Sequence, residues 1–168
     1  MTLFRPFLWL LLALALVRGF LYAAIVPPWQ APDEPAHFER ARAALTAAEW
    51  RSTSEDRLPW YNELVLALYT QHYWDFLPDG RQDYSEDALL SQYLTHYGEI
   101  YSGLYGSRPA YAAIGLPLFL APKQPVLLQL YLVRLNTVLM NVGIILLAFL
   151  ITRLIFPRDQ FMIYGVPV

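Results

Sequence analysis

The chain has 168 residues, of which 57% are hydrophobic and 15% are charged, and its formal net charge is −2 at pH 7. A slightly acidic chain lacks the positive charge with which proteins neutralise nucleic-acid phosphates, which argues against nucleic acid as a partner. The absence of cysteine excludes disulfides, thiolate metal sites and cysteine nucleophiles. The positive mean hydropathy of +0.32 predicts a membrane protein with a large polar insertion rather than a soluble domain.

The first apolar segment covers residues 3–26, and its only charged residues are Arg5 and Arg18. A transmembrane helix needs about 20 predominantly apolar residues, so this segment is long enough to span a bilayer. Pro27 and Pro28 follow it and are expected to end the helix. A cleaved signal peptide is the competing interpretation, but Ala23-Ala24-Ile25 is a poor small-x-small cleavage site.

The second apolar segment, residues 126–151, is again long enough to span and contains one charge, Arg134. Positive residues next to spans favour the cytoplasmic side, and Arg5, Arg153 and Arg158 flank the two segments. We therefore predict a multi-pass membrane protein with both ends cytoplasmic. Residues 152–168 are then a cytoplasmic tail or the start of a further span.

The exoplasmic loop between the two spans, residues 27–125, carries thirteen acidic and seven basic residues. It contains no convincing alternation with a period of two, so no sheet is predicted and the fold class is all-α. Residues 109–122 are too short to cross the membrane and are predicted to lie along its interface or to be tucked into the protein. Three helices are expected in the loop: one from Pro35 through Trp50, one from Pro59 through Phe76, and one capped by Ser85 and stopped by Gly98.

The most informative motif is PPWQAPDEPAHFERAR, residues 27–42, which follows the first span directly. It places Asp33 and Glu34 at the start of a helix, with His37 one turn after Asp33 and Arg40 further along. Asp33 has two interpretations, as an N-cap or as a catalytic base, and Glu34 is also a favourable charge at a helix start. The spacing Asp-Glu-x-x-His lacks the second histidine of a zinc hydrolase motif, so no metal site is predicted.

The order of these features resembles the amino-terminal end of polytopic GT-C-type glycosyltransferases, in particular bacterial relatives of the protein mannosyltransferases, many of unassigned substrate. The residues that carry the resemblance are a first span, prolines, Asp33-Glu34-Pro35-Ala36-His37-Phe38, and Tyr131-Leu132-Val133-Arg134-Leu135 in the second span. The resemblance implies that the chain belongs to a bacterial plasma membrane, that the first exoplasmic loop supplies a catalytic acidic residue, and that the sugar donor is carried on a polyprenyl phosphate.

The sequence departs from that family in two respects. Ser107-Arg108-Pro109-Ala110 stands where many relatives have His-Pro-Pro-Leu, so a role for that histidine is not carried over. Family members also continue through many further spans. The chain is therefore expected to be a fragment of a polytopic GT-C fold, inactive alone, whose partners are membrane lipid, lipid-linked sugar and missing transmembrane helices or a partner subunit.

Sugar transfer from a phosphate carrier to a hydroxyl needs a base and a group that stabilises the departing phosphate. We assign Asp33 as the base and Glu34 as a second catalytic residue that positions the acceptor or binds a divalent cation, with His37 sharing this task. Arg40 is a candidate phosphate ligand. Arg18 and Arg134 lie at a matched depth of about 12 Å inside the outer membrane boundary and are predicted to bind the donor phosphate, with snorkelling as the alternative.

Two other functional classes remain open from the sequence. The chain is alternatively a non-catalytic membrane subunit whose exoplasmic loop binds a partner or a polysaccharide. A small transporter subunit would use Arg18 and Arg134 for an anionic substrate, but two spans rarely form a pathway without oligomerisation. The sugar, the acceptor, the donor lipid and any metal requirement are not encoded in a recognisable motif.

Overall fold

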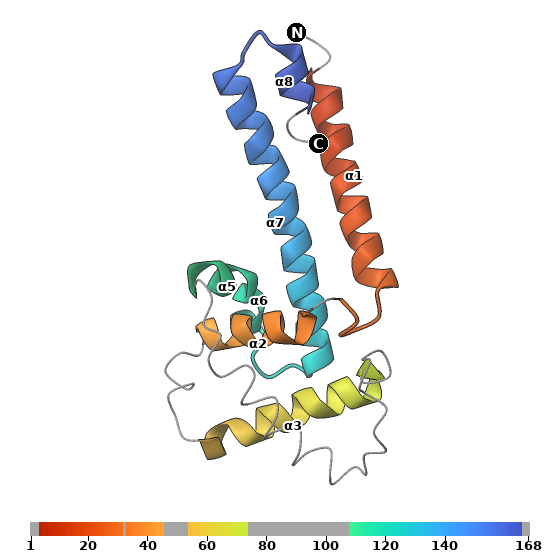
Figure 1. Cartoon of the computed structure of the whole chain (residues 1–168), viewed down its shortest axis with the longest axis vertical. Coiled ribbons are helices and arrows are strands. Elements are labelled where there is room, and N and C mark those ends of the chain that lie inside the picture. The colour runs from red at the N-terminus through yellow and green to blue at the C-terminus, as the bar shows by residue number, and fades with distance from the viewer. Residues whose placement is uncertain (1–3, 32, 46–53, 74–107, 166–168) are drawn as a thin grey trace. The chain divides into compact units, whose positions relative to one another are not determined.

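The structure, a computed structural model, describes residues 4–31, 33–45, 54–73 and 108–165 (Figure 1). All regular secondary structure within these ranges is helical, as the sequence predicts. The chain divides into two compact units, one formed by residues 26–133 and the other by residues 1–25 and 134–168. The third predicted loop helix, near Ser85, lies outside the described residues.

Two helices are long and apolar enough to span a membrane, α1 (Phe4–Ile25) and α7 (Val126–Ile155). Helix α1 ends one residue before the predicted boundary because Pro27 and Pro28 cannot continue it. Helix α7 extends beyond the predicted end at Ile151. Hydropathy marks the apolar run, whereas the helix itself continues until Pro157 disfavours helical backbone at Phe156.

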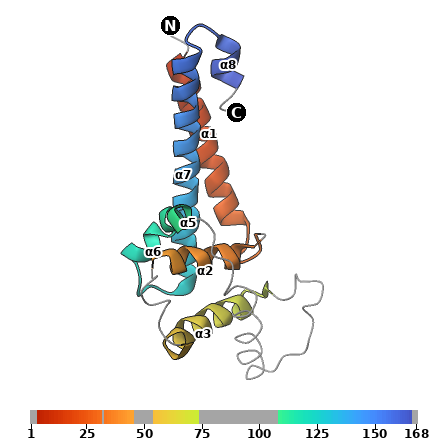
Figure 2. The same cartoon turned by 60° about the vertical axis from the view of Figure 1, so that its left-hand side comes forward.

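Helices α1 and α7 run side by side in opposite directions within the unit that contains α1 and the carboxyl-terminal part of α7 (Figures 1 and 2). They approach closely at Gly19, where an added Cβ would lie 2.5 Å from Val138 Cγ1. A glycine at this position therefore permits a contact that a larger residue would block, as is common where membrane helices pack. Arg134, 5% exposed, donates from Nη1 to the Ala23 carbonyl at 3.1 Å.

Helix α2 (Glu34–Leu45) follows α1 after a short turn. Two residues of this turn, Trp29 and Asp33, have positive φ angles of 67° and 55°. The Glu34 carboxylate accepts a hydrogen bond from the Trp29 amide at 2.8 Å, which ties the start of the helix back to the turn. Such a backward contact satisfies an amide outside the helix, as in a capping box.

Helix α3 (Ser54–Thr70) differs from its predicted boundaries at both ends. It begins before Pro59, which we expected to open it, and it ends before the predicted Phe76. Pro59 is the sixth residue of α3, beyond the four N–H groups that lack an intrahelical acceptor, so it costs the helix one hydrogen bond and does not mark the first residue. At the other end, His72 has a positive φ of 54°, which is incompatible with continued right-handed helix.

The predicted interfacial segment forms two short helices, α5 (Arg108–Ile114) and α6 (Leu116–Leu120). Helix α2 packs mainly against α5 and also contacts α6. Leu118 is buried, whereas Leu116, Phe119 and Leu120 are exposed. The exposed residues follow the i, i+3, i+4 spacing of one helix face, which is consistent with the interfacial prediction without testing it. Helix α8 (Gln160–Gly165) follows α7.

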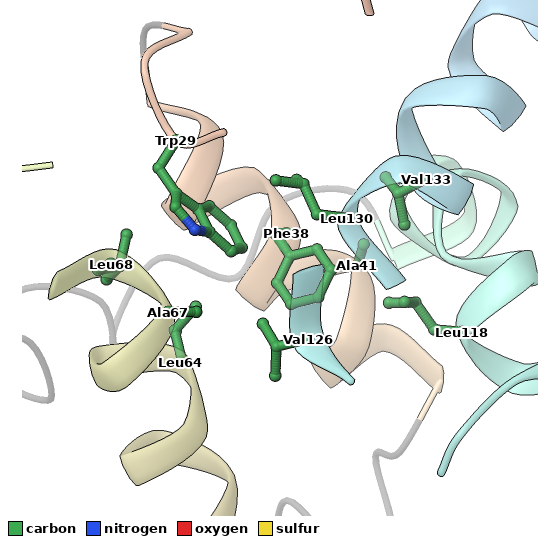
Figure 3. Close-up of a cluster of buried hydrophobic side chains, with 10 residues drawn as sticks. All are labelled: Trp29, Phe38, Ala41, Leu64, Ala67, Leu68, Leu118, Val126, Leu130 and Val133. Atoms are coloured by element: carbon green, nitrogen blue, oxygen red, sulfur yellow. The ribbon is translucent and has the colours of Figure 1, made fainter. Parts of the chain in front are cut away.

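The core of the unit formed by residues 26–133 gathers side chains from four helices and the turn before α2 (Figure 3). Trp29 and Phe38 meet edge to face with ring centroids 5.4 Å apart, a favoured aromatic geometry. Phe38 thus faces inward from α2. The remaining members of the core are Ala41, Leu64, Ala67, Leu68, Leu118, Val126, Leu130 and Val133.

Candidate functional site

The acidic pair at the start of α2 consists of two side chains in different environments. Asp33 is exposed, and its carbonyl accepts the backbone hydrogen bond of His37 at 3.0 Å. Its φ of 55° lies outside the extended region usual for an N-cap, and its carboxylate has no hydrogen bond to another described residue. Glu34 is half-buried and holds the Trp29 amide. The structure therefore gives the local anchoring role to Glu34 and leaves the Asp33 carboxylate facing solvent.

One turn beyond Asp33, two side chains of α2 converge on Tyr111 of α5. His37 Nδ1 lies 2.8 Å from the Tyr111 hydroxyl oxygen, and Arg40 Nη1 donates to the same oxygen at 3.1 Å. The rings of His37 and Tyr111 stack with centroids 5.9 Å apart and planes inclined by 23°. The Arg40 guanidinium carbon lies 5.8 Å from the centre of the Tyr111 ring, within cation–π range. We call His37, Arg40 and Tyr111 the tyrosine cluster.

A second polar contact fixes the chain before α7. The buried side chain of Gln129 accepts a hydrogen bond from Arg42 Nη1 at 3.0 Å. Its amide nitrogen donates to the carbonyls of Ala121, Pro122 and Gln124 at 3.2, 3.1 and 2.9 Å. These contacts satisfy carbonyls in a segment without regular structure. They hold the α6–α7 connection against α2 and give Arg42 a structural role.

The two arginines predicted within the spans differ in exposure. Arg18 on α1 is exposed, whereas Arg134 on α7 is buried and donates to the Ala23 carbonyl. The Ala23 carbonyl belongs to the last turn of α1, where carbonyls lack an intrahelical donor. Arg134 thus caps α1, and the prediction that both arginines bind a phosphate stays a prediction.

Sequence reasoning missed Tyr111 and the partners of Gln129. Tyr111 is separated by 74 residues from His37, and no local pattern distinguishes it from the other tyrosines of the loop. Gln129 carried a local signal, because an amide in an apolar helix must find a hydrogen-bonding partner. Among the residues described by the structure, no three His, Asp or Glu side chains gather closely enough to hold a metal ion.

Comparisons of this chain with protein families, with curated proteins and with solved structures find no match.

Proposed function

We propose that this chain is the amino-terminal portion of a membrane glycosyltransferase that transfers a sugar from a polyprenyl-phosphate donor to an exoplasmic acceptor. The observation that carries the proposal is the exposed Asp33 carboxylate, which lies close in sequence to the end of the apolar helix α1. The resemblance of residues 33–38 to GT-C-type enzymes supplies the reaction class. The contact between Glu34 and Trp29 supports it further, because it fixes the backbone beside Asp33.

The proposed chemistry is a displacement at the anomeric carbon of the sugar. Asp33 takes the proton of the acceptor hydroxyl as the acceptor oxygen bonds to that carbon. The bond between the carbon and the donor phosphate oxygen breaks, and its electron pair leaves with the phosphate. An exposed carboxylate is accessible to an acceptor, whereas a carboxylate engaged in a cap would first have to break its hydrogen bond.

The proposed location follows from charge and hydropathy. With α1 and α7 as spans and Arg5, Arg153 and Arg158 on the cytoplasmic side, residues 27–125 face the exoplasm. Asp33 then lies near the membrane boundary, where a lipid-held phosphate meets a water-soluble acceptor. In this arrangement Glu34 positions Asp33 and the acceptor. Arg18 and Arg134 remain proposed ligands of donor phosphate.

The test is sugar transfer by the full-length membrane protein, purified and reconstituted with polyprenyl-phosphate sugars. Asp33→Asn keeps the size of the side chain and removes the base, so we expect transfer to fall by at least about a hundredfold with an unchanged amount of folded protein. The matched control is Glu63→Gln, which removes one exposed carboxylate from α3 and should leave transfer unchanged.

Transfer activity, rather than stability, separates catalysis from capping. Under the proposal Asp33→Ala is as inactive as Asp33→Asn, and it also loses about 1 kcal/mol of stability because alanine tolerates the φ of 55° less well than aspartate or asparagine. If Asp33 were only a cap, Asp33→Asn would be almost silent, and Asp33→Ala would lower stability by about 1 kcal/mol. Near-normal transfer by the asparagine variant would remove Asp33 as the base.

A further inference from the structure

The proton arrangement of the tyrosine cluster follows from the partners of the Tyr111 hydroxyl. A guanidinium can only donate, so Arg40 Nη1 uses the hydroxyl oxygen of Tyr111 as its acceptor. The hydroxyl proton is then available to donate to His37 Nδ1, 2.8 Å away. This arrangement gives the Tyr111 hydroxyl both a donor and an acceptor, and it places the proton of a neutral imidazole on Nε2. If the ring is charged, Nε2 also carries a proton, so in both states this nitrogen is a donor.

The charge of Arg40 is incompletely satisfied. Arginine has five N–H donors, of which Nη1 contacts Tyr111. Arg40 Nε is buried and has no hydrogen-bond partner among the described residues, and no described carboxylate forms an ion pair with this guanidinium. The terminal nitrogen Nη2 is not among the buried unpartnered atoms and makes no hydrogen bond to a described residue, so it is the donor that is open to an added acceptor.

The cluster therefore presents donors of two kinds from adjacent turns of one helix. His37 is exposed and Arg40 is half-buried. Their separation of three residues places them on one face of α2, and both are held by the same phenol. An arginine beside a second donor is the arrangement that suits phosphate oxygens, which accept several charge-assisted hydrogen bonds.

We propose that His37, Arg40 and Tyr111 form a binding site for a phosphate group, with Arg40 and His37 contacting the anion and Tyr111 positioning both. The source of the phosphate is a lipid headgroup or a free phosphate, which share this chemistry. The inference deepens the proposed function, on which it rests for the identity of a lipid-linked donor. Its test measures binding and does not require sugar transfer.

The experiment measures binding of a fluorescent polyprenyl monophosphate to the full-length protein in nanodiscs of neutral lipid. The corresponding polyprenol, which lacks phosphate, is the reference ligand, and inorganic phosphate is the competitor. We expect the monophosphate to bind more tightly than the polyprenol. Arg40→Gln should weaken binding of the monophosphate by roughly ten- to a hundredfold, the range for losing a charge-assisted contact, without affecting the polyprenol.

Two further variants separate positioning from folding. Tyr111→Phe keeps the ring and removes the hydroxyl, so it should weaken monophosphate binding several-fold while the thermal midpoint stays close to normal. Arg42→Gln removes a neighbouring arginine that contacts Gln129, and should leave monophosphate affinity within about twofold even if stability falls. A selective loss in the first variant and its absence in the second would support the proposed positioning role of Tyr111.

The competitor identifies the source of the phosphate. Displacement by inorganic phosphate that depends on Arg40 supports the site with free phosphate as its ligand, and resistance to inorganic phosphate supports a lipid headgroup. Equal affinity for monophosphate and polyprenol, or unchanged monophosphate affinity in Arg40→Gln, would overturn the site. Loss of transfer in Asp33→Asn with intact monophosphate binding would support both proposals. Normal transfer in Asp33→Asn together with Arg40-dependent binding would refute the catalytic role of Asp33 and would support the phosphate site.

Discussion

Trp29 is a fully enclosed residue in an unusual backbone conformation. Its exposure is 0%, its φ is 67°, and its ring packs edge to face against Phe38. Positive φ is costly for a bulky residue, so the surrounding contacts must hold it there. The Glu34 carboxylate does so by accepting its amide hydrogen bond. The turn that positions Asp33 therefore depends on a buried aromatic anchor.

The buried Nε1 of the Trp29 indole has no hydrogen-bond partner among the described residues, and this leads to a testable prediction. Trp29→Phe removes this unsatisfied donor and keeps a large ring. The free energy gained by removing the donor should nearly cancel the free energy lost because the smaller ring fills less volume. We expect a change in unfolding free energy within about 1 kcal/mol for Trp29→Phe, against a loss of about 3–5 kcal/mol for Trp29→Ala. Denaturation in detergent, followed by circular dichroism, measures both.

The comparison of the two variants decides the role of the indole nitrogen. A loss of several kcal/mol in Trp29→Phe, close to that of Trp29→Ala, would show that the N–H has a partner that stabilises the turn.

At the same scale, sequence reasoning identified the motif but not its partners. The pairing of Asp33 and Glu34 was visible as a helix start after a span, because capping and charge preferences act locally. The sequence does not show that Glu34 anchors the turn while the Asp33 carboxylate stays exposed, since this depends on the φ of Asp33 and on the position of the Trp29 amide. The role of Tyr111 could not be predicted from the sequence, because its contact with α2 is set by tertiary packing.

At the scale of elements, the apolar helices were predicted more accurately than the loop helices. Length and hydropathy determine α1 and α7 almost completely, and prolines set the end of α1. Helix α3 has no comparable boundary signal, and the prediction that it begins at Pro59 is wrong. Helix ends depend on weak local preferences that tertiary contacts override, such as the burial of Leu64 and Leu68.

Arg134 connects the two apolar helices and provides the prediction at this scale. Its hydrogen bond to the Ala23 carbonyl supplies a donor to the last turn of α1 and a favourable charge at that end. We expect Arg134→Gln to lower the thermal midpoint of the full-length protein by roughly 5 °C, since a buried charged hydrogen bond is lost. Arg18→Gln should leave the midpoint unchanged, because Arg18 is exposed.

Donor saturation kinetics on the same variants address the phosphate prediction for these arginines. If Arg18 and Arg134 bind the donor phosphate, both variants raise the KM for the lipid donor and leave the KM for the acceptor unchanged. A donor defect in neither variant would leave capping as the role of Arg134 and would remove Arg18 from the site.

At the scale of the whole molecule, polar and apolar residues are segregated along the chain. Thirteen of the fourteen acidic residues lie in residues 27–125, and the two helices that pass the length and hydropathy criteria bracket that segment. Two apolar helices alone are also compatible with a buried helix of a soluble protein or a signal sequence. For most exposed apolar residues of α1 and α7, only a bilayer or further protein would provide an apolar environment.

Thiol labelling of this cysteine-free chain tests the membrane assignment and the topology together. Cysteine would replace three residues that are exposed in the structure: Glu63 on α3, Thr137 on α7, and Arg158 after α7. With an impermeant reagent on intact cells, we expect Glu63→Cys to label, and Arg158→Cys to label only after permeabilisation. Thr137 lies eleven residues after Val126, which is about 17 Å along the helix, so lipid should protect it in both conditions.

The exposure of Thr137 makes its protection informative, because no described part of the chain covers this side chain. Labelling of Thr137→Cys in intact cells would show that α7 borders water at this depth and would contradict a simple lipid-embedded span. Protection of Glu63→Cys until permeabilisation would reverse the topology. In that case Asp33 and the tyrosine cluster, which belong to the same compact unit as Glu63, would face the cytoplasm, and transfer to an exoplasmic acceptor would be excluded.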